Sequence, residues 1–173
     1  MGSFESMLSG GHPNSLGRTV EVVDLVLADR ERLGELFACY GSADPVVRLR
    51  VSNAMKRIEA ERHDWLVPLI DPLIDDVGRL DQDSARWTLA QLFQRLADDM
   101  SEDQRARARR LLKSNLASAT DWIVLICTLE TLAEWARTDP ELDRWLVPHI
   151  ARLMADPRKS VARRAAKVQA RRG

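Results

Sequence analysis

Aromatic residues are scarce in this chain: they make up 5% of its 173 residues, and five of them are Trp. Cysteine is scarcer still, because Cys39 and Cys127 are the only two. Neither stands at a spacing that would bind a metal, and both have apolar neighbours in the sequence. We therefore expect two reduced thiols in an apolar core rather than a disulfide.

Long apolar runs are absent too. No stretch approaches the roughly 20 residues that a helix needs to cross a bilayer, and the first residues lack the basic-then-apolar order of a secretory signal. Glycine and proline are few, at 8 and 7, whereas apolar residues reach 45% and charged residues 30%. This composition is typical of a folded globular chain. The sequence predicts one cytoplasmic domain without a membrane partner.

The residues that usually carry chemistry are missing or isolated. The sequence has no Gly-rich phosphate loop, no nucleophile elbow and no cysteine-histidine constellation. His12, His63 and His149 each lack a second metal ligand at helical spacing. Paired carboxylates at 75–76 and at 98–99 fall at expected helix ends or turns, where capping or solvation is their ordinary role. We expect no catalytic residue, no metal site and no cofactor.

From residue 19 onward, apolar residues recur at helical period. Asp44 is the expected N-cap of a helix that starts at Pro45, and Asp83 or Ser84 is the expected N-cap of a later one. The apolar positions of these two helices repeat at an offset of 38: 51, 54, 55 and 58 become 89, 92, 93 and 96. A third version at an offset of 37 places Ile126, Leu129 and Ala133 inward, with Glu130 at the remaining position.

A second helix is expected after each of these first helices. Two of the second helices contain nearly the same words, WLVPLIDPLIDD at 65–76 and WLVPHIARLMAD at 145–156, and belong to the first and third full units. Pro72 is expected to bend or delay the earlier one. The helices are expected over 18–29, 30–41, 45–61, 65–79, 83–99, 102–117, 121–137, 142–155 and 158–171.

A period of 37 to 38 residues built from two antiparallel helices is typical of an alpha-solenoid. The stretch DPVVRLRVSNAMKRI resembles the Asp-Pro-x-x-Arg start of a HEAT first helix, and the chain is similar to short bacterial HEAT-repeat proteins of unassigned function. The resemblance implies an all-α fold: a right-handed alpha-solenoid of about four HEAT-like helix pairs plus a C-terminal half-repeat. The resemblance covers about residues 18–172 and supplies no catalytic residue. We expect a flexible lead over 1–16 and a HEAT-like domain over 17–173.

Positive charge offers the most pointed functional signal. The formal net charge is zero, yet residues 157–173 carry 7 basic side chains and no acidic one. Two expected helices show basic stripes opposite their apolar faces, and Trp87 beside Arg86 is a candidate interface anchor. The candidate partner-binding residues are Arg86, Trp87, Arg105, Arg109, Arg110, Lys113, Arg163, Arg164, Lys167 and Arg171.

Two functions remain open on the sequence alone. The first is a non-catalytic scaffold that binds a protein or peptide on the surface formed by successive helices. The second is a nucleic-acid-binding protein that uses the stripes at 105–113 and 158–172. Its enzymatic version is similar to HEAT-like glycosylases of alkylated bases, which place Trp, Asp and Arg together, and Trp135 with Asp139 is the nearest spacing. Exposed end faces also leave self-association open.

Overall fold

The computed structural model describes residues 3–172, and every regular element in that range is helical. Short 3-10 segments, labelled η, join or extend several of the α-helices. The elements are α1 Phe4–Leu8, α2 Thr19–Ala28, η1 Arg30–Arg32, α3 Leu33–Ala38, η2 Cys39–Gly41, α4 Pro45–Glu61, α5 His63–Leu66, η3 Val67–Leu69, α6 Ile70–Asp75, η4 Val77–Arg79, α7 Asp83–Arg95, η5 Ala97–Asp99, α8 Glu102–Ser118, α9 Trp122–Ala136, α10 Pro140–Met154 and α11 Lys159–Arg172.

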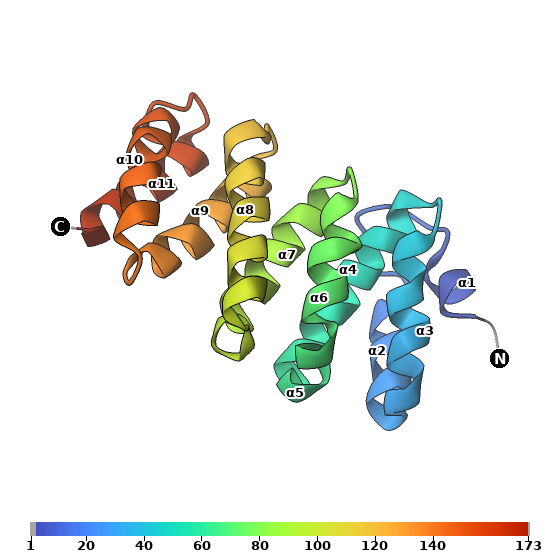
Figure 1. Cartoon of the computed structure of the whole chain (residues 1–173). Helices are drawn as coiled ribbons and strands as arrows, with labels where there is room; N and C mark the ends of the chain where they lie inside the picture. The colour runs from blue at the N-terminus through green and yellow to red at the C-terminus, as the bar shows by residue number, and fades with distance from the viewer. Residues whose placement is uncertain (1–2, 173) are drawn as a thin grey trace.

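The helices follow one another from one end of the molecule to the other, with the two termini at opposite ends (Figure 1). Helices α3, α6, α8 and α10 run side by side along one face, and α4, α7, α9 and α11 lie behind them. Within the rear row each helix packs against the next, and α8 and α10 both pack against α9. The structure is therefore all-α and elongated, with a core that runs between the two rows.

Helix α4 shows why the sequence reads as it does. Asp44 accepts a hydrogen bond from the Val46 N–H at 2.8 Å, and Pro45 occupies the first turn, where its missing N–H costs nothing. The four predicted inward residues of this helix, Val51, Ala54, Met55 and Ile58, are fully buried. Val47, one turn earlier on the same face, is fully buried as well. The predicted cap and inward face of α4 are confirmed.

Proline divides the next helix into pieces. Between 63 and 79 the chain forms α5, η3, α6 and η4 in succession instead of one continuous helix. Pro68 lies inside η3 and Pro72 lies in the first turn of α6. A proline has no N–H and its ring clashes with the preceding turn, so two prolines four residues apart interrupt the helix here, whereas Pro148 alone lies inside the unbroken α10 Pro140–Met154. Apolar residues still face the core at Leu66, Ile70 and Leu73.

The register predicted for α9 is wrong by two residues. The buried positions of α7 recur in α9 at an offset of 39, since Thr128 and Thr131 are fully buried where α7 has Leu89 and Leu92. Of the three residues predicted to face inward at an offset of 37, Leu129 is buried, whereas Ile126 and Ala133 are only partly buried. Thr is a polar residue, so a pattern that looks for apolar residues passes over it.

The N-cap predicted for α7 is also wrong. Gln82 occupies the N-cap position, and Asp83 and Ser84 are already helical. Gln82 instead donates from its side chain to the Pro45 backbone oxygen at 3.0 Å and accepts from Arg48 at 2.6 Å. The start of α7 is thus bonded to the start of α4. By contrast, Ser101 is a true N-cap of α8, because its side chain accepts from the Gln104 N–H at 3.1 Å.

The twin phrases both lie in the front row of helices: the first runs through α5 and α6, and the second through α10. The phrases begin at different positions along their helices, however. Trp65 is two residues after the start of α5, whereas Trp145 is five residues after the start of α10. The later phrase is therefore shifted by about one helical turn. A shift of one turn preserves the buried face, as Leu66 and Leu146 are both fully buried.

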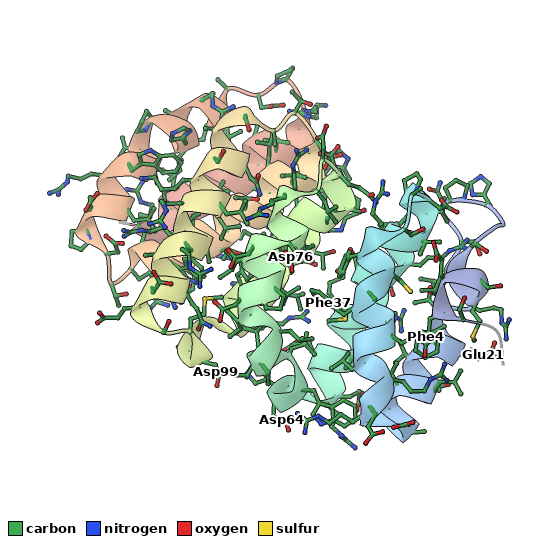
Figure 2. All side chains as sticks on the ribbon, turned by 45° about the vertical axis from the view of Figure 1, so that its right-hand side comes forward. Phe4, Glu21, Phe37, Asp64, Asp76 and Asp99 are labelled. Carbon is green, nitrogen blue, oxygen red and sulfur yellow. The ribbon has the colours of Figure 1, made fainter. Side chains whose placement is uncertain are left out.

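The lead predicted over 1–16 contains α1, which packs against the rest of the molecule, and its first two residues lie outside the described range. Helix α1 buries Phe4 and Leu8 completely, and the Phe4 N–H donates to Glu35 of α3 at 3.0 Å (Figure 2). The Arg32 guanidinium lies over the Phe4 ring at 4.0 Å. This segment covers the end of the molecule at which α2, α3 and α4 would otherwise be exposed.

A single side chain of α4 holds the rest of this segment in place. The Arg50 guanidinium is buried and donates to four backbone oxygens: Leu8 at 2.6 Å, Gly10 at 2.6 Å, His12 at 3.2 Å and Ser15 at 3.1 Å. Gly17, at a φ of +52°, passes so close that a Cβ there would lie 2.8 Å from the guanidinium carbon. Arg50 lies more than 30 residues from its acceptors, so no local pattern reveals this contact.

Candidate partner-binding surface

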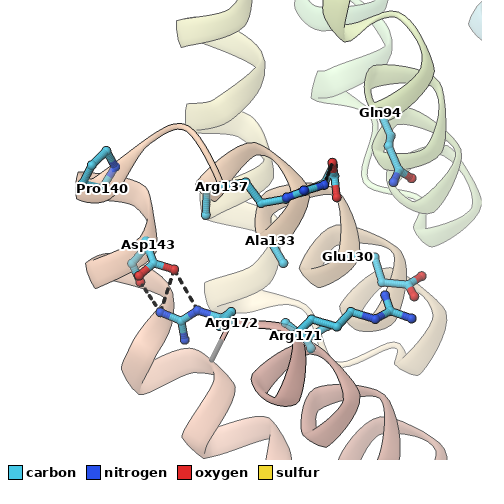
Figure 3. A pocket seen from close by; sticks show the side chains of 11 residues that line it. Gln94, Glu130, Ala133, Arg137, Pro140, Asp143, Arg171 and Arg172 are labelled. Atoms are coloured by element: carbon cyan, nitrogen blue, oxygen red, sulfur yellow. Dashed lines mark hydrogen bonds and ion pairs between the residues drawn. The ribbon is translucent and has the colours of Figure 1, made fainter.

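A cleft lies at the C-terminal end, between α9, α10 and α11 (Figure 3). Its volume is about 770 Å³. An apolar floor of Ala133, Ala136 and Val168 is surrounded by charged side chains. The full lining is Gln94, Glu130, Ala133, Glu134, Ala136, Arg137, Pro140, Asp143, Val168, Arg171 and Arg172.

Every acidic side chain of this cleft has a basic partner. Glu134 pairs with Arg137 at 2.9 Å. Asp143 pairs with Arg172 at 2.7 Å, which holds the pKa of that carboxyl below its usual range (Figure 3). Glu130 pairs with an arginine of α11 outside the lining, Arg164.

Arg171 is the exception in this charge balance. It is exposed, it lines the cleft, and it makes no hydrogen bond or ion pair with any residue in the range 3–172. Because every carboxylate of the lining is already paired, the charge of Arg171 is uncompensated. The cleft is therefore suited to a ligand that brings a negative group.

Arg171 is the last member of a longer stripe along α11. Lys159, Arg163, Lys167 and Arg171 stand four residues apart, so they lie on one face with a rise of about 6 Å between neighbours. All four are exposed and without a hydrogen-bond or ion-pair partner in the part of the chain that the structure describes. We call these four residues the α11 stripe. Like charges at this spacing cost some helix stability, which an anionic partner would relieve.

The other predicted stripe, on α8, is used inside the molecule. The Arg105 guanidinium lies over the Trp135 ring of α9 at 4.1 Å and donates to the Ala97 backbone oxygen at 3.0 Å. Burial lowers the pKa of Arg105. Arg109 pairs with Asp139, the N-cap residue of α10. Both arginines thus join α8 to the following pair of helices.

Of the two remaining α8 cations, Lys113 contacts a neighbouring helix and Arg110 is exposed. Lys113 lies over the Trp145 ring of α10 at 4.7 Å, and His149 stacks on the same ring at 4.0 Å between centroids. Burial, followed by the nearby charge of Arg152 and Lys113, lowers the pKa of His149. Arg110 is exposed. Of the four predicted α8 residues, three therefore contact neighbouring helices.

The predicted pair at the start of α7, Arg86 and Trp87, also makes its contacts within the molecule. Arg86 forms ion pairs with Asp81 at 2.8 Å and with Asp83 at 3.3 Å. Trp87 is partly buried and packs against the core. A more exposed indole belongs to Trp122, at the first position of α9, of which 47% is exposed.

A smaller pocket of about 420 Å³ lies between α8 and the turn from α9 to α10. Arg105, Arg109, Trp135 and Asp139 all line it, so the structure brings together residues that the sequence leaves apart. Trp135 is only 4% exposed, and its indole N–H has no partner. Asp139 accepts from the Leu142 N–H at 3.0 Å, and this bond, followed by that of Arg109, lowers the pKa of the carboxyl.

Histidine 63 forms a separate charged cluster at the other edge of the molecule, near Asp64 and Asp99 in Figure 2. Its ring bonds to Glu59 through Nδ1 at 2.8 Å and to Asp99 through Nε2 at 2.7 Å. Asp99 first, and then Glu59, raise the pKa of His63. Arg95 pairs with the second oxygen of Glu59 at 2.9 Å. The cluster therefore connects the end of α4 to the end of α7.

The two thiols, Cys39 and Cys127, are free and buried, and burial raises the pKa of Cys39 to about 11. Within residues 3–172, no three His, Cys, Asp or Glu side chains gather as metal ligands would. Over the same range, no helix is long and apolar enough to cross a membrane.

No family model, curated protein or solved structure matches the chain. Its function is therefore inferred from its own geometry and charge. Sequence patterns find the basic end of the chain but miss the cleft, because its lining comes from α7, α9, α10 and α11. Lys159 is also missing from the predicted partner-binding residues, although its spacing of four from Arg163 is a signal that would have found it.

Proposed function

We propose that the chain is a non-catalytic interaction scaffold, a HEAT-like right-handed alpha-solenoid that binds a protein or peptide partner. The packing of each first helix on the next, with a second helix after each, supports the repeat. Equivalent second-helix positions support it too, because the buried residues Ile70, Ala108 and Leu146 recur at intervals of 38. A stack of this kind presents an extended surface and needs no reaction to use it.

The unbalanced charge at the C-terminal end is the single observation that carries the binding role. The cleft between α9, α10 and α11 pairs each of its acids, which leaves Arg171 and the rest of the α11 stripe without partners. Positive groups in this arrangement steer a negative partner toward the surface and select against a basic one. The partner we propose therefore contacts α11 and reaches into the cleft.

Capture from a cell extract tests this function. The immobilised chain is incubated with a nuclease-treated extract of the cells that make it, beside the variant R163E/K167E/R171E. A variant with the same charge change elsewhere, R57E/R79E/R144E, is the matched control, because all three of its arginines are exposed. We expect a protein that the wild type and the control retain and the α11 variant loses. Equal retention on all three would contradict the proposal.

Nucleic-acid binding is the second candidate, and the same unpaired cations favour it. Two observations weigh against it: the formal net charge is zero, and α11 carries no aromatic residue on which a base would stack. Titration of labelled DNA and RNA at low and physiological salt decides. Binding through four phosphate contacts predicts that log K falls with log salt at a slope of about −3.6.

The glycosylase version of this candidate has less support. Trp135 and Asp139 do lie with Arg105 and Arg109 around one pocket. Each of them already has a structural role, however: Asp139 caps α10 and pairs with Arg109, and the Trp135 ring is covered by Arg105. Both oxygens of Asp139 already accept a hydrogen bond, one from the Leu142 N–H and one from Arg109, so the carboxylate serves as a helix cap and an ion-pair partner.

A further inference from the structure

We propose that the seam between α8 and α10 binds a phosphate monoester, carried by a phosphoserine or phosphothreonine of a partner protein. The inference rests on the proposed scaffold function in that the partner is a protein, but it uses a surface other than α11. Three observations carry it: the basic side chains that the two helices bring together, the lack of a carboxylate among them, and the acids toward both ends of the seam.

Three basic side chains from two neighbouring helices gather around one indole ring. Helices α8 and α10 lie side by side (Figure 1). Lys113 of α8 lies over the Trp145 ring of α10 at 4.7 Å, and His149 stacks on the same ring with 4.0 Å between the centroids. Arg152, about one turn after His149, donates to the Leu116 backbone oxygen of α8 at 2.8 Å, which holds its guanidinium at the seam. We call Lys113, His149 and Arg152 the seam cluster.

The seam cluster contains an excess of positive charge. Residues 104–120 carry five basic side chains and no acidic one, and residues 144–155 also have no acidic side chain. In the described part of the chain, neither Lys113 nor His149 has a hydrogen-bond or ion-pair partner. After burial, the charges of Arg152 and Lys113 lower the pKa of His149, so the charges that act on this imidazole are positive. An anion here would therefore meet donors that are still available.

Acidic side chains lie toward both ends of the seam. Asp139, the N-cap residue of α10, lines the smaller pocket together with Glu102. Asp156 lies one turn beyond Arg152, and both of its oxygens accept from Arg158, at 2.9 and 2.8 Å. A nucleic-acid strand carries a negative charge at every nucleotide, so a strand that followed the seam would run into these acids. A single compact anion fits between them.

A phosphate monoester matches the seam cluster in charge and in acceptors. It carries a charge of about −1.5 to −2 at neutral pH and has three strong acceptor oxygens. Lys113 and Arg152 supply two permanent charges, and His149 supplies a third when it takes up a proton. A carboxylate brings one charge and two oxygens, so it would satisfy fewer of these donors. The seam cluster therefore favours a phosphorylated side chain over an aspartate or a glutamate.

The open position of the cluster favours a phosphate that is attached to a protein. Neither of the two clefts described above includes Lys113, His149 or Arg152 in its lining. Free small ligands are usually enclosed by their sites, whereas a group on a protein chain gains affinity from contacts on either side of it. Arg110, exposed three residues before Lys113, is available for such a contact.

Synthetic peptides that differ only in the phosphate test the inference. The probe is a short labelled peptide of Gly, Ala and Ser with one phosphoserine at its centre, and the controls carry Ser or Glu at that position. We expect the phosphopeptide to bind at least roughly 10-fold more tightly than either control. K113Q/R152Q should lose this preference. R57Q/R79Q, which removes two exposed charges elsewhere, should keep it.

The titration of His149 gives a second readout, which a purely structural role would not change. A bound dianion opposes the effect of Lys113 and Arg152, so the phosphopeptide should raise the pKa of His149. Because the complex then binds more protons than the free protein, binding should tighten as pH falls from about 8 to about 6.5. NMR of the histidine rings follows this change, with His63 as an unchanged internal control. H149Q should bind more weakly and without the pH dependence.

Three results would overturn the inference. They are equal binding of the phosphopeptide and the Ser peptide, equal losses in K113Q/R152Q and R57Q/R79Q, and tighter binding of a DNA strand that K113Q/R152Q abolishes. Unchanged circular dichroism of the variants shows that they fold, and H149Q tests the seam without removing a permanent charge.

The two proposals fail separately. If the phosphopeptide does not bind but the α11 variant loses a protein from the extract, the scaffold function stands and the seam site is wrong. If the phosphopeptide binds as expected but the α11 variant retains every protein, the role of α11 is wrong and the seam site stands.

Discussion

At the scale of single residues, Arg50 bonds the N-terminal segment to α4. Burying a guanidinium is expensive unless its donors are satisfied, and here the acceptors are backbone oxygens of the N-terminal segment instead of carboxylates. The same bonds stabilise the N-terminal segment, because its backbone oxygens would otherwise need other donors. One side chain thus determines the conformation of a segment of more than ten residues.

Arg50→Met is expected to detach this segment. The substitution keeps the apolar stem and removes the donors, and it should lower the free energy of unfolding by about 3 kcal/mol. Denaturant unfolding measures the loss, and proteolysis within residues 3–17 should accelerate. Arg57→Met, at an exposed position of the same helix, is expected to change stability by less than about 0.5 kcal/mol. Equal effects at both positions would contradict the role assigned to Arg50.

His63 makes stability depend on pH. Its pKa is raised in the folded state by Asp99 and Glu59, so its contribution is full below the pKa of the unfolded chain and is lost as pH rises through the folded pKa. His63→Gln should therefore destabilise the protein more at pH 5.5 than at pH 8. His149 has a lowered pKa, so His149→Gln should change the slope in the opposite sense. Unfolding midpoints across this range test both signs.

At the scale of elements, the joint between α7 and α9 contains an unusual amount of buried polarity. Thr131 donates to the Ala90 backbone oxygen of α7 at 2.8 Å. Thr128, also fully buried, has no hydrogen-bond partner for its hydroxyl. Two residues of the same type, one turn apart on one helix, therefore make opposite contributions to stability.

Replacing each threonine by valine separates these contributions. The shapes are nearly equal, so the hydroxyl is the main difference. Thr131→Val should cost about 1 kcal/mol because it leaves the Ala90 carbonyl with one fewer donor, whereas Thr128→Val should add about 1 kcal/mol of stability. Denaturant unfolding of both variants measures the two values. Losses of the same size in both would mean that Thr128 has a partner after all.

The packing of α9 on α7 also shows which features of the fold can be predicted from the sequence. Helix bounds are predicted to within a few residues, because caps, prolines and apolar period are local signals. The register of α9 is not, since Thr occupies two of its inward positions. Arg105, Arg109 and Lys113 form a clear stripe in the sequence, yet Trp135, Asp139 and Trp145, which they contact, lie 30 to 32 residues further along the chain. Only the folded chain shows which basic residues remain unpaired.

At the scale of the whole molecule, the two ends differ. The N-terminal end is covered by α1, which packs on α2, α3 and α4. At the other end α11 packs on α9 and α10 and exposes its basic face. In a linear array, stability depends on neighbours, so the end helix with the fewest neighbours should open first.

Hydrogen exchange tests this order of opening. Helix α7 packs on α4 and on α9, whereas α11 has neighbours on one side only. Amides of α7 should therefore exchange at least roughly 10-fold more slowly than those of α11 under native conditions. Exchange of both helices at one common rate would instead indicate that the molecule opens only as a single cooperative unit.

The bonds of Arg50 also set an order in time during synthesis. On a ribosome, the backbone oxygens that it binds are made 35 to 42 residues before the arginine itself. During that interval the segment lacks the guanidinium that binds it, so residues made before α4 become fixed only after Arg50 has been made. Any enzyme or chaperone that acts on this segment therefore has its best access before α4 emerges.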